Sequence, residues 1–103
     1  MSKKFSDEEW NKIETEANVI LNRFAENMDK AADDSTVVSV VREWQEHISR
    51  YYYDCNAEVY YGIAVLYTAD DDYKISLENR KSGLSAFMNK AIINYCVKIL
   101  QGV

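Results

Sequence analysis

Residues 51–67 read YYYDCNAEVYYGIAVLY and hold six of the eight tyrosines of the chain. A tyrosine offers a large flat apolar face and one hydroxyl group, so it suits a half-wet surface better than a dry core. Taken singly, each of these tyrosines is better explained as a core residue whose hydroxyl reaches the rim. Because six gather in one segment, we predict that the segment as a whole forms the wall of a groove for a bulky, partly polar, ring-rich ligand.

The same stretch predicts where two helices meet. Apolar residues recur at steps of three and four on both sides of it, and one unbroken helix that reached Thr68 would span more than thirty residues and roughly 45 Å. That length is too great for a domain of this size. Because Asp and Asn side chains compete for backbone amides, we predict a break at Asp54–Asn56 and a third helix from about Asn56 to Thr68. Its inward side is expected to consist of Val59, Ile63 and Leu66.

Two helices are predicted upstream of that stretch. Ser6-Asp7-Glu8-Glu9 has the form of a capping box, and apolar residues then recur every three or four positions. The first helix is therefore expected to run from about Asp7 to Met28. A polar loop follows, in which Asp34 or Ser35 caps the second helix. The buried side of the second helix is expected to comprise Val37, Val41, Trp44, Ile48 and Tyr51 or Tyr52.

Downstream, residues 69–72 are predicted to form a turn that caps a short fourth helix ending near Glu78. A loop at residues 79–83 leads to a last helix, Leu84 to Leu100, which is apolar on nearly every face from Ala91 onward. Such a helix must be covered on several sides, so we expect it at the centre of the fold. The predicted fold class is all-α, with residues 1–103 forming a single domain of about five helices with a ligand cleft.

Composition limits the classes of protein to which the chain can belong. A chain of 103 residues without proline and with three glycines suits one helical domain. The net charge is −5 and no basic stripe exists, which argues against direct nucleic-acid binding by this segment. No apolar run is long enough for a signal peptide or a membrane span. The two cysteines are then most simply reduced thiols, and we expect a cytoplasmic protein.

Catalytic and metal-binding chemistry finds little support. His47 is the only histidine, which excludes a site built on several imidazoles, and a surface or rim position is expected for it rather than haem ligation. Cys55 lies eight residues from His47, about two helical turns, which is too far for a direct hydrogen bond on a straight helix. Asp70, Asp71 and Asp72 lack the alternating spacing, glycine and terminal Glu of a calcium loop, so capping explains them better. We therefore predict no enzyme, no metal site and no cofactor.

Five segments carry a resemblance to a known family. Residues 46–58, EHISRYYYDCNAE, closely resemble the signature H-x-I-x-R-x-x-Y-D-C-x-x-E of the TipAS antibiotic-recognition domain, the C-terminal half of certain MerR-type transcription activators. Residues 66–70, LYTAD, resemble its M-Y-V-A-D block, and residues 82–92, SGLSAFMNKAI, resemble P-G-L-A-x-Y/F-x-x-x-A-I. Residues 5–10, FSDEEW, and 24–28, FAENM, resemble Y-T-x-E-D-W and F-A-x-L-M. The resemblance covers nearly the whole chain in order.

The resemblance implies an all-helical, globin-like fold with a cleft that binds antibiotics, thiopeptides above all. In full-length activators of this kind, drug binding signals to an upstream DNA-binding domain and a dimerising coiled coil. This sequence lacks that half, so we expect either an excised domain or a stand-alone drug binder. Thiopeptide-capturing members carry a second cysteine where this chain has Gly62, which predicts non-covalent binding, with Cys55 as a remaining candidate nucleophile. Asp72-Tyr73 replaces the family's Arg-Phe and changes the charge of that rim.

The candidate ligand contacts flank the predicted break or face the seam of the last helix. Their rings would stack on flat faces of the ligand, while Asp54, Glu58 and His47 would supply polar contacts. Trp44 and Phe87 are equally well explained as core residues. The ten candidates are Trp44, His47, Tyr51, Tyr52, Asp54, Cys55, Glu58, Tyr60, Tyr67 and Phe87.

Three functions remain open at this point. The first is recognition of a small-molecule, thiopeptide-like antibiotic, without membrane or direct nucleic-acid partners. The second is an interaction module whose aromatic face packs on a partner subunit, and a homodimer is one form it could take. The third and weakest is a small enzyme.

Overall fold

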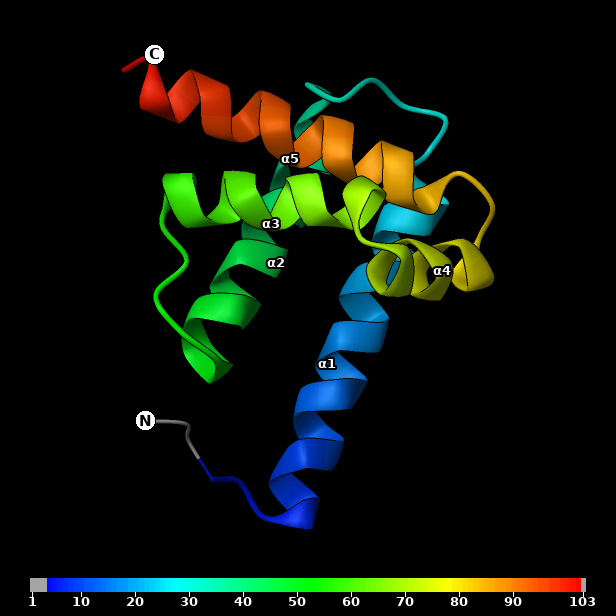
Figure 1. Ribbon diagram of the computed structural model, residues 1–103, viewed down its shortest axis with the longest axis vertical. Coiled ribbons are helices and arrows are strands. Elements are labelled where there is room, and N and C mark those ends of the chain that lie inside the picture. Colours follow the sequence, from blue (N-terminus) through cyan, green and yellow to red (C-terminus); the bar gives the residue numbers. More distant parts are fainter. Residues whose placement is uncertain (1–3, 103) are drawn as a thin grey trace.

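The computed structural model describes residues 4–102, and within that range every regular element is an α-helix (Figure 1). The all-α fold of five helices predicted from the sequence is therefore confirmed. None of these helices combines the length and the apolar character needed to cross a membrane. The helices are α1 (Asp7–Glu26), α2 (Ser35–Tyr51), α3 (Ala57–Ala69), α4 (Asp71–Arg80) and α5 (Leu84–Leu100).

Helix α5 is the central element, as its apolar sequence predicts. It contacts each of the other four helices and lies along α3, with which it shares the most extensive interface (Figure 1). Its fully buried side chains include Leu84, Met88 and Ile92. The side-chain amide of Asn89 on α5 donates a 2.8 Å hydrogen bond to the Ala64 carbonyl of α3, which shows that the two helices lie close together at this point. Packing against α5 therefore makes the largest contribution to the position of α3.

Side-chain caps begin most of the helices. Ser6 and Glu9 form the reciprocal capping box of α1, with hydrogen bonds of 3.2 and 3.1 Å. Asp34 accepts from the Thr36 amide at the start of α2, and Asn56 accepts from Val59 at the start of α3. Each of these carboxylate, hydroxyl or amide oxygens satisfies a backbone N–H that the first helical turn cannot pair. The predicted caps and the predicted break after α2 are confirmed.

Two helices end two residues away from the predicted position. Helix α1 ends at Glu26 rather than Met28, because the Asn27 side chain donates a 2.7 Å hydrogen bond to the Arg23 carbonyl in place of a further helical turn. Helix α4 continues to Arg80 instead of ending near Glu78. The last turn of α4 is useful to the fold, because it places Glu78 beneath the start of α5.

The inward side of α3 was predicted wrongly. Val59 and Leu66 are 38% and 43% exposed, and Ile63 is half-buried. The buried side chains of α3 are instead Tyr60, Ala64 and Tyr67. Helix α3 is apolar on nearly all faces, so its sequence marks no single side. The small Ala64 allows the close approach to α5, and that packing selects the buried face.

Helix α5 is capped from a distance by Glu78 of α4. Its own N-cap, Gly83, has a φ of 90° and provides no side chain, so the first amides of α5 need another acceptor. The two oxygens of Glu78 accept from the Gly83 and Ser85 amides at 3.0 Å each. These hydrogen bonds lower the pKa of Glu78, the Gly83 contact being the largest cause. The carboxylate therefore joins the last turn of α4 to the first turn of α5.

We expect Glu78→Gln to lower the thermal unfolding temperature at neutral pH, because the charged acceptor of two amides is lost. The folded-state pKa of Glu78 lies below its ordinary value of 4.5, so its stabilisation is present above that pH and is lost as the pH falls through the lowered pKa. The difference between wild type and variant should shrink in circular dichroism melts as the pH is lowered below 4.5. Glu14→Gln, at an exposed position within α1, is the matched control. A constant difference at all pH values would contradict this role.

Candidate functional site

A pocket of about 400 Å³ lies beside the break between α2 and α3. Helices α1 to α4 and the α2–α3 connection all contribute to its wall, and six of its ten lining residues carry an aromatic ring. None of the ten is an Asp, Glu, Lys or Arg, so the wall is apolar with a few polar atoms. The lining residues are Ala17, Trp44, His47, Ile48, Tyr52, Tyr53, Ile63, Leu66, Tyr67 and Tyr73.

The inner wall of the pocket is a fixed set of rings. Trp44 stacks on His47 with centroids 5.1 Å apart and planes 7° from parallel. Its indole N–H donates a 3.0 Å hydrogen bond to the Tyr67 hydroxyl, which links α2 to α3. Burial raises the pKa of Tyr67, so this hydroxyl keeps its proton and remains a donor. The rings are held by packing and by hydrogen bonds before any ligand arrives.

Four residues of the pocket form an open rim. Tyr52, Tyr53 and Tyr73 are 47%, 55% and 50% exposed, and Leu66 is 43% exposed. Tyr73 also meets Tyr67 edge-on, with centroids 5.8 Å apart. Exposed tyrosines around a largely buried aromatic floor can extend contact with a ligand that is larger than the pocket.

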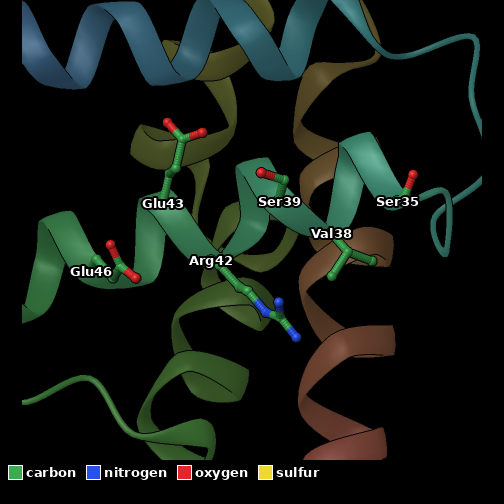
Figure 2. Close-up of a pocket in the computed structure, with 6 residues that line it drawn as sticks. All are labelled: Ser35, Val38, Ser39, Arg42, Glu43 and Glu46. Atoms are coloured by element: carbon green, nitrogen blue, oxygen red, sulfur yellow. The ribbon is translucent and has the colours of Figure 1, made fainter.

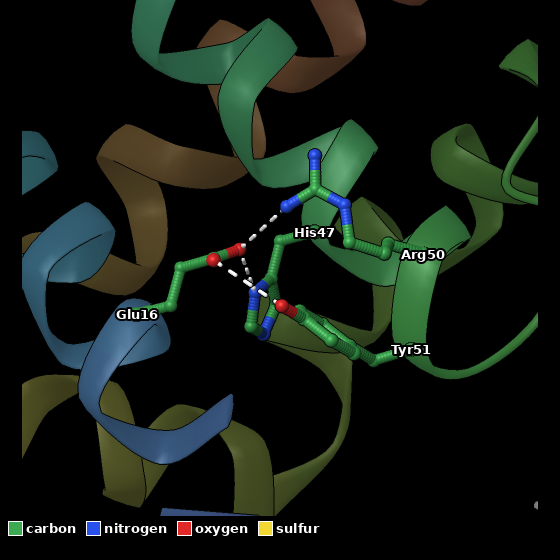
Figure 3. Close-up of polar contacts among 4 residues, drawn as sticks. All are labelled: Glu16, His47, Arg50 and Tyr51. Carbon is green, nitrogen blue, oxygen red and sulfur yellow. Dashed lines mark hydrogen bonds and ion pairs between the residues drawn. The ribbon is translucent and has the colours of Figure 1, made fainter. Parts of the chain in front are cut away.

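A polar cluster behind the pocket joins α1 to α2 (Figure 3). Glu16 of α1 lies 2.8 Å from Nδ1 of His47 and 3.4 Å from a guanidinium nitrogen of Arg50. The Tyr51 hydroxyl donates to the other oxygen of Glu16 at 3.4 Å. His47 is only 1% exposed, so the predicted surface or rim position was wrong. Burial is tolerated because Glu16 satisfies the polar ring edge.

The pocket brings together four of the ten predicted contacts, namely Trp44, His47, Tyr52 and Tyr67. The other six lie outside it. Tyr51 turns to Glu16, Asp54 and Glu58 are exposed, and Phe87 packs against the hydrophobic core. Cys55 and Tyr60 are both buried in that core.

Six lining residues were not predicted from the sequence. Tyr53 belongs to the tyrosine-rich stretch and could have been found there, Ile63 lies one helical turn before Tyr67, and Leu66 is its neighbour in the chain. The other three are Ala17, Ile48 and Tyr73. Ala17 comes from α1, so only the packing of a helix remote in sequence brings it to the pocket, whereas Tyr73 comes from α4, which directly follows α3.

Tyr60 is a core residue rather than a pocket residue. It is completely buried, and its hydroxyl donates a 2.7 Å hydrogen bond to the Val41 carbonyl of α2. Burial raises its pKa well above the ordinary range. One tyrosine of the cluster therefore secures α3 against α2 and does not face a ligand.

Cys55 sits inside the turn between α2 and α3. Its amide donates to the Ser49 hydroxyl at 3.0 Å, and its carbonyl accepts from the Gln45 side chain at 2.8 Å. The side chain is 2% exposed, and burial raises the pKa of the thiol to about 11. The lowering effect of the nearby helix N-terminus is outweighed, so the thiolate is scarce at neutral pH.

Another surface depression lies along α2, but it lacks the features of a ligand site (Figure 2). Its lining comes from a single helix, and the side chains do not converge, since Glu43 and Arg42 point to opposite sides of α2. Glu43 is already paired with Arg23. Among residues 4–102, no group of three or more His, Cys, Asp or Glu side chains is placed to hold a metal ion. The lining residues are Ser35, Val38, Ser39, Arg42, Glu43 and Glu46.

We expect Tyr60→Phe to lower the free energy of unfolding by about 1–2 kcal/mol, because a buried hydrogen bond to the Val41 carbonyl is lost. Chemical denaturation measures this difference. Tyr61→Phe is the matched control, because Tyr61 is the adjacent residue and is 38% exposed, and its effect should stay within about 0.5 kcal/mol. Equal effects of the two substitutions would show that the hydroxyl of Tyr60 has no structural role.

Comparison with known proteins gives three consistent matches. The TipAS antibiotic-recognition domain family matches residues 1–95. The HTH-type transcriptional activator mta of Bacillus subtilis (strain 168) is 33% identical over 92 residues, which cover 89% of this chain and 36% of mta. The HTH-type transcriptional activator TipA of Streptomyces coelicolor is 28% identical over 96 residues, which cover 91% of this chain and 38% of TipA. The chain thus spans somewhat over a third of the length of these relatives.

A solved structure agrees with these sequence matches. It shows nosiheptide in complex with TipAS and concerns a thiopeptide antibiotic multidrug resistance system from Streptomyces lividans. The two folds superpose with a TM-score of 0.85 at 28% sequence identity, over 92% of this chain and 68% of the other.

Proposed function

We propose that this chain, which belongs to the TipAS antibiotic-recognition domain family, binds thiopeptide-like antibiotics non-covalently in its aromatic pocket. The observation that carries the proposal is the pocket itself. Six aromatic rings from α2, α3, α4 and the α2–α3 connection line this pocket, which has a volume of about 400 Å³. The family membership supports the same ligand class as the aromatic wall, since the related TipAS is known in complex with nosiheptide.

The size and chemistry of the pocket favour flat, ring-containing ligands. Its volume lies at the lower end of the range for small-molecule sites. A whole macrocycle would not fit inside, so one ring group would enter the pocket and the remainder would lie on the tyrosine rim. Stacking on Trp44 and edge contacts with Tyr67 would each contribute about 0.5–1.5 kcal/mol beyond burial.

The chemistry of the site favours reversible binding over covalent capture. Cys55 is the cysteine nearest to the pocket in sequence, but its thiol is buried and protonated at neutral pH. No side chain that lines the pocket is an activated nucleophile. The proposal also assigns no catalytic role to His47, because this ring bonds to Glu16 and stacks on Trp44 and is not paired with a nucleophile.

The relatives suggest the context in which binding would act. Both are named HTH-type transcriptional activators, and this chain matches a little over a third of each. We place the chain as the effector domain of such a cytoplasmic regulator or as a stand-alone drug binder. The alternative, a protein interaction module, would use the same exposed tyrosines, and ligand titration separates the two.

Nosiheptide should raise the unfolding temperature of the wild-type domain, because a ligand that binds only the folded state stabilises it. Tyr52→Ala should weaken nosiheptide binding by about fivefold to tenfold, since a rim ring is lost at small cost to folding. Tyr61→Ala is the matched control: Tyr61 comes from the same tyrosine-rich stretch and is comparably exposed, but it lies outside the pocket. Calorimetry gives both affinities. Equal losses for the two variants would exclude this pocket as the binding site.

Incubation with nosiheptide at neutral pH should give no stoichiometric adduct by mass spectrometry. With a pKa of about 11, roughly one Cys55 thiol in several thousand is ionised near pH 7.5. Alkylation of the native protein by iodoacetamide should accordingly be slow at neutral pH and should accelerate as the pH rises towards 11. Peptide mapping separates Cys55 from Cys96. An adduct at neutral pH that disappears in Cys55→Ser would overturn non-covalent binding.

A further inference from the structure

The polar atoms of the pocket are few, and most of them are adaptable. Tyrosine hydroxyls can both donate and accept hydrogen bonds and can rotate to suit a partner. The indole N–H of Trp44 already donates to Tyr67. The remaining polar group is the imidazole of His47, whose two ring nitrogens have different environments. Selectivity between ligands with and without a hydrogen-bond donor therefore depends mainly on this ring.

Glu16 determines the tautomer of His47. A carboxylate accepts hydrogen bonds and does not donate them, and Glu16 lies 2.8 Å from Nδ1. The neutral ring must therefore carry its proton on Nδ1, which leaves Nε2 as an acceptor. Arg50 and Tyr51 also contact the carboxylate, so Glu16 is held in position from the α2 side (Figure 3).

The Nε2 atom has no protein partner and opens to the pocket. In the part of the chain that the structure describes, every fully buried side-chain nitrogen or oxygen has a hydrogen-bond partner. The single hydrogen bond of the His47 side chain in residues 4–102 is the one at Nδ1. Nε2 must therefore keep some accessible surface, and the accessible space beside His47 is the pocket that it lines. Nε2 is therefore an unpaired acceptor on the pocket wall that an incoming ligand can meet.

We infer that His47 is a specificity-determining residue, which offers Nε2 as a fixed acceptor and selects ring-bearing ligands that have an N–H or O–H donor on the inserted edge. This rests on the proposed function of the pocket. A ligand without a donor would cover Nε2 and leave it unpaired beside the stacked Trp44, which is costly in a largely dry site. Glu16 is then a positioning residue, because it acts on the ligand only through the tautomer of His47.

The test uses two fragment probes of the same shape, indole, which has an N–H donor, and benzothiophene, which has none. NMR titration of the labelled protein yields both affinities and locates both probes. The ratio of the two affinities should favour indole about fivefold more in wild type than in His47→Phe, which keeps a ring against Trp44 but lacks the acceptor. Tyr61→Phe, outside the pocket, should leave the ratio unchanged.

A measurement on the wild-type protein keeps the test independent of how His47→Phe folds. The imidazole nitrogen spectrum should show a protonated Nδ1 and an unprotonated Nε2, and indole should shift the Nε2 resonance while benzothiophene does not. In Glu16→Leu the Nε2-protonated tautomer should become populated. A protonated Nε2 in wild type, or an unchanged Nε2 resonance with both probes bound in the pocket, overturns the role of His47 alone. Binding of neither probe in the pocket overturns this role and the proposed aromatic ligand site together.

Discussion

The structure depends on the interruption between α2 and α3. Residues 52–56 divide what would otherwise be one long helix into two, which are joined by hydrogen bonds from Trp44 to Tyr67 and from Tyr60 to the Val41 carbonyl. The turn is secured on both sides: the Asn56 side chain accepts from the Val59 amide of α3, and the backbone of Cys55 bonds to side chains of α2. Because α3 is then free to lie along α5, the rings at the end of α2 and on α3 meet around one space.

The tyrosine-rich segment divides its rings among three tasks, and the direction of each ring decides which. Tyr60 points into the core and bonds the α2 backbone, Tyr67 forms part of the pocket wall, and Tyr52 and Tyr53 make an exposed rim. A chain built on Leu and Phe could fill the same core, but its hydroxyl bonds between helices would be lost. One residue type thus serves both the packing of the fold and the surface that we assign to a ligand.

Polar contacts inside the apolar wall are nearly all internal to the protein. The indole N–H of Trp44 donates to the Tyr67 hydroxyl, and the Glu16 carboxylate accepts from Nδ1 of His47. Because of this second contact, the imidazole of His47 is tolerated at 1% exposure. These bonds also join helices that are distant in sequence, so the wall is rigid where its rings stack. The polar atom that the protein leaves unpaired in the pocket, Nε2 of His47, is the one on which the specificity proposed above depends.

Local sequence determined the helices and their boundaries, whereas the tertiary structure decided which faces they present. The caps at Ser6, Asp34 and Asn56 act within one turn of the chain, and a helix as apolar as α5 must be covered, so both could be predicted. Four pocket residues were found in the same way, because they flank the break. The buried face of α3, the burial of His47 and the entry of Ala17 into the pocket could not be predicted. Each depends on contacts between elements far apart in the chain, such as Glu16 with a residue 31 positions away, and short-range periodicity carries no information about such contacts.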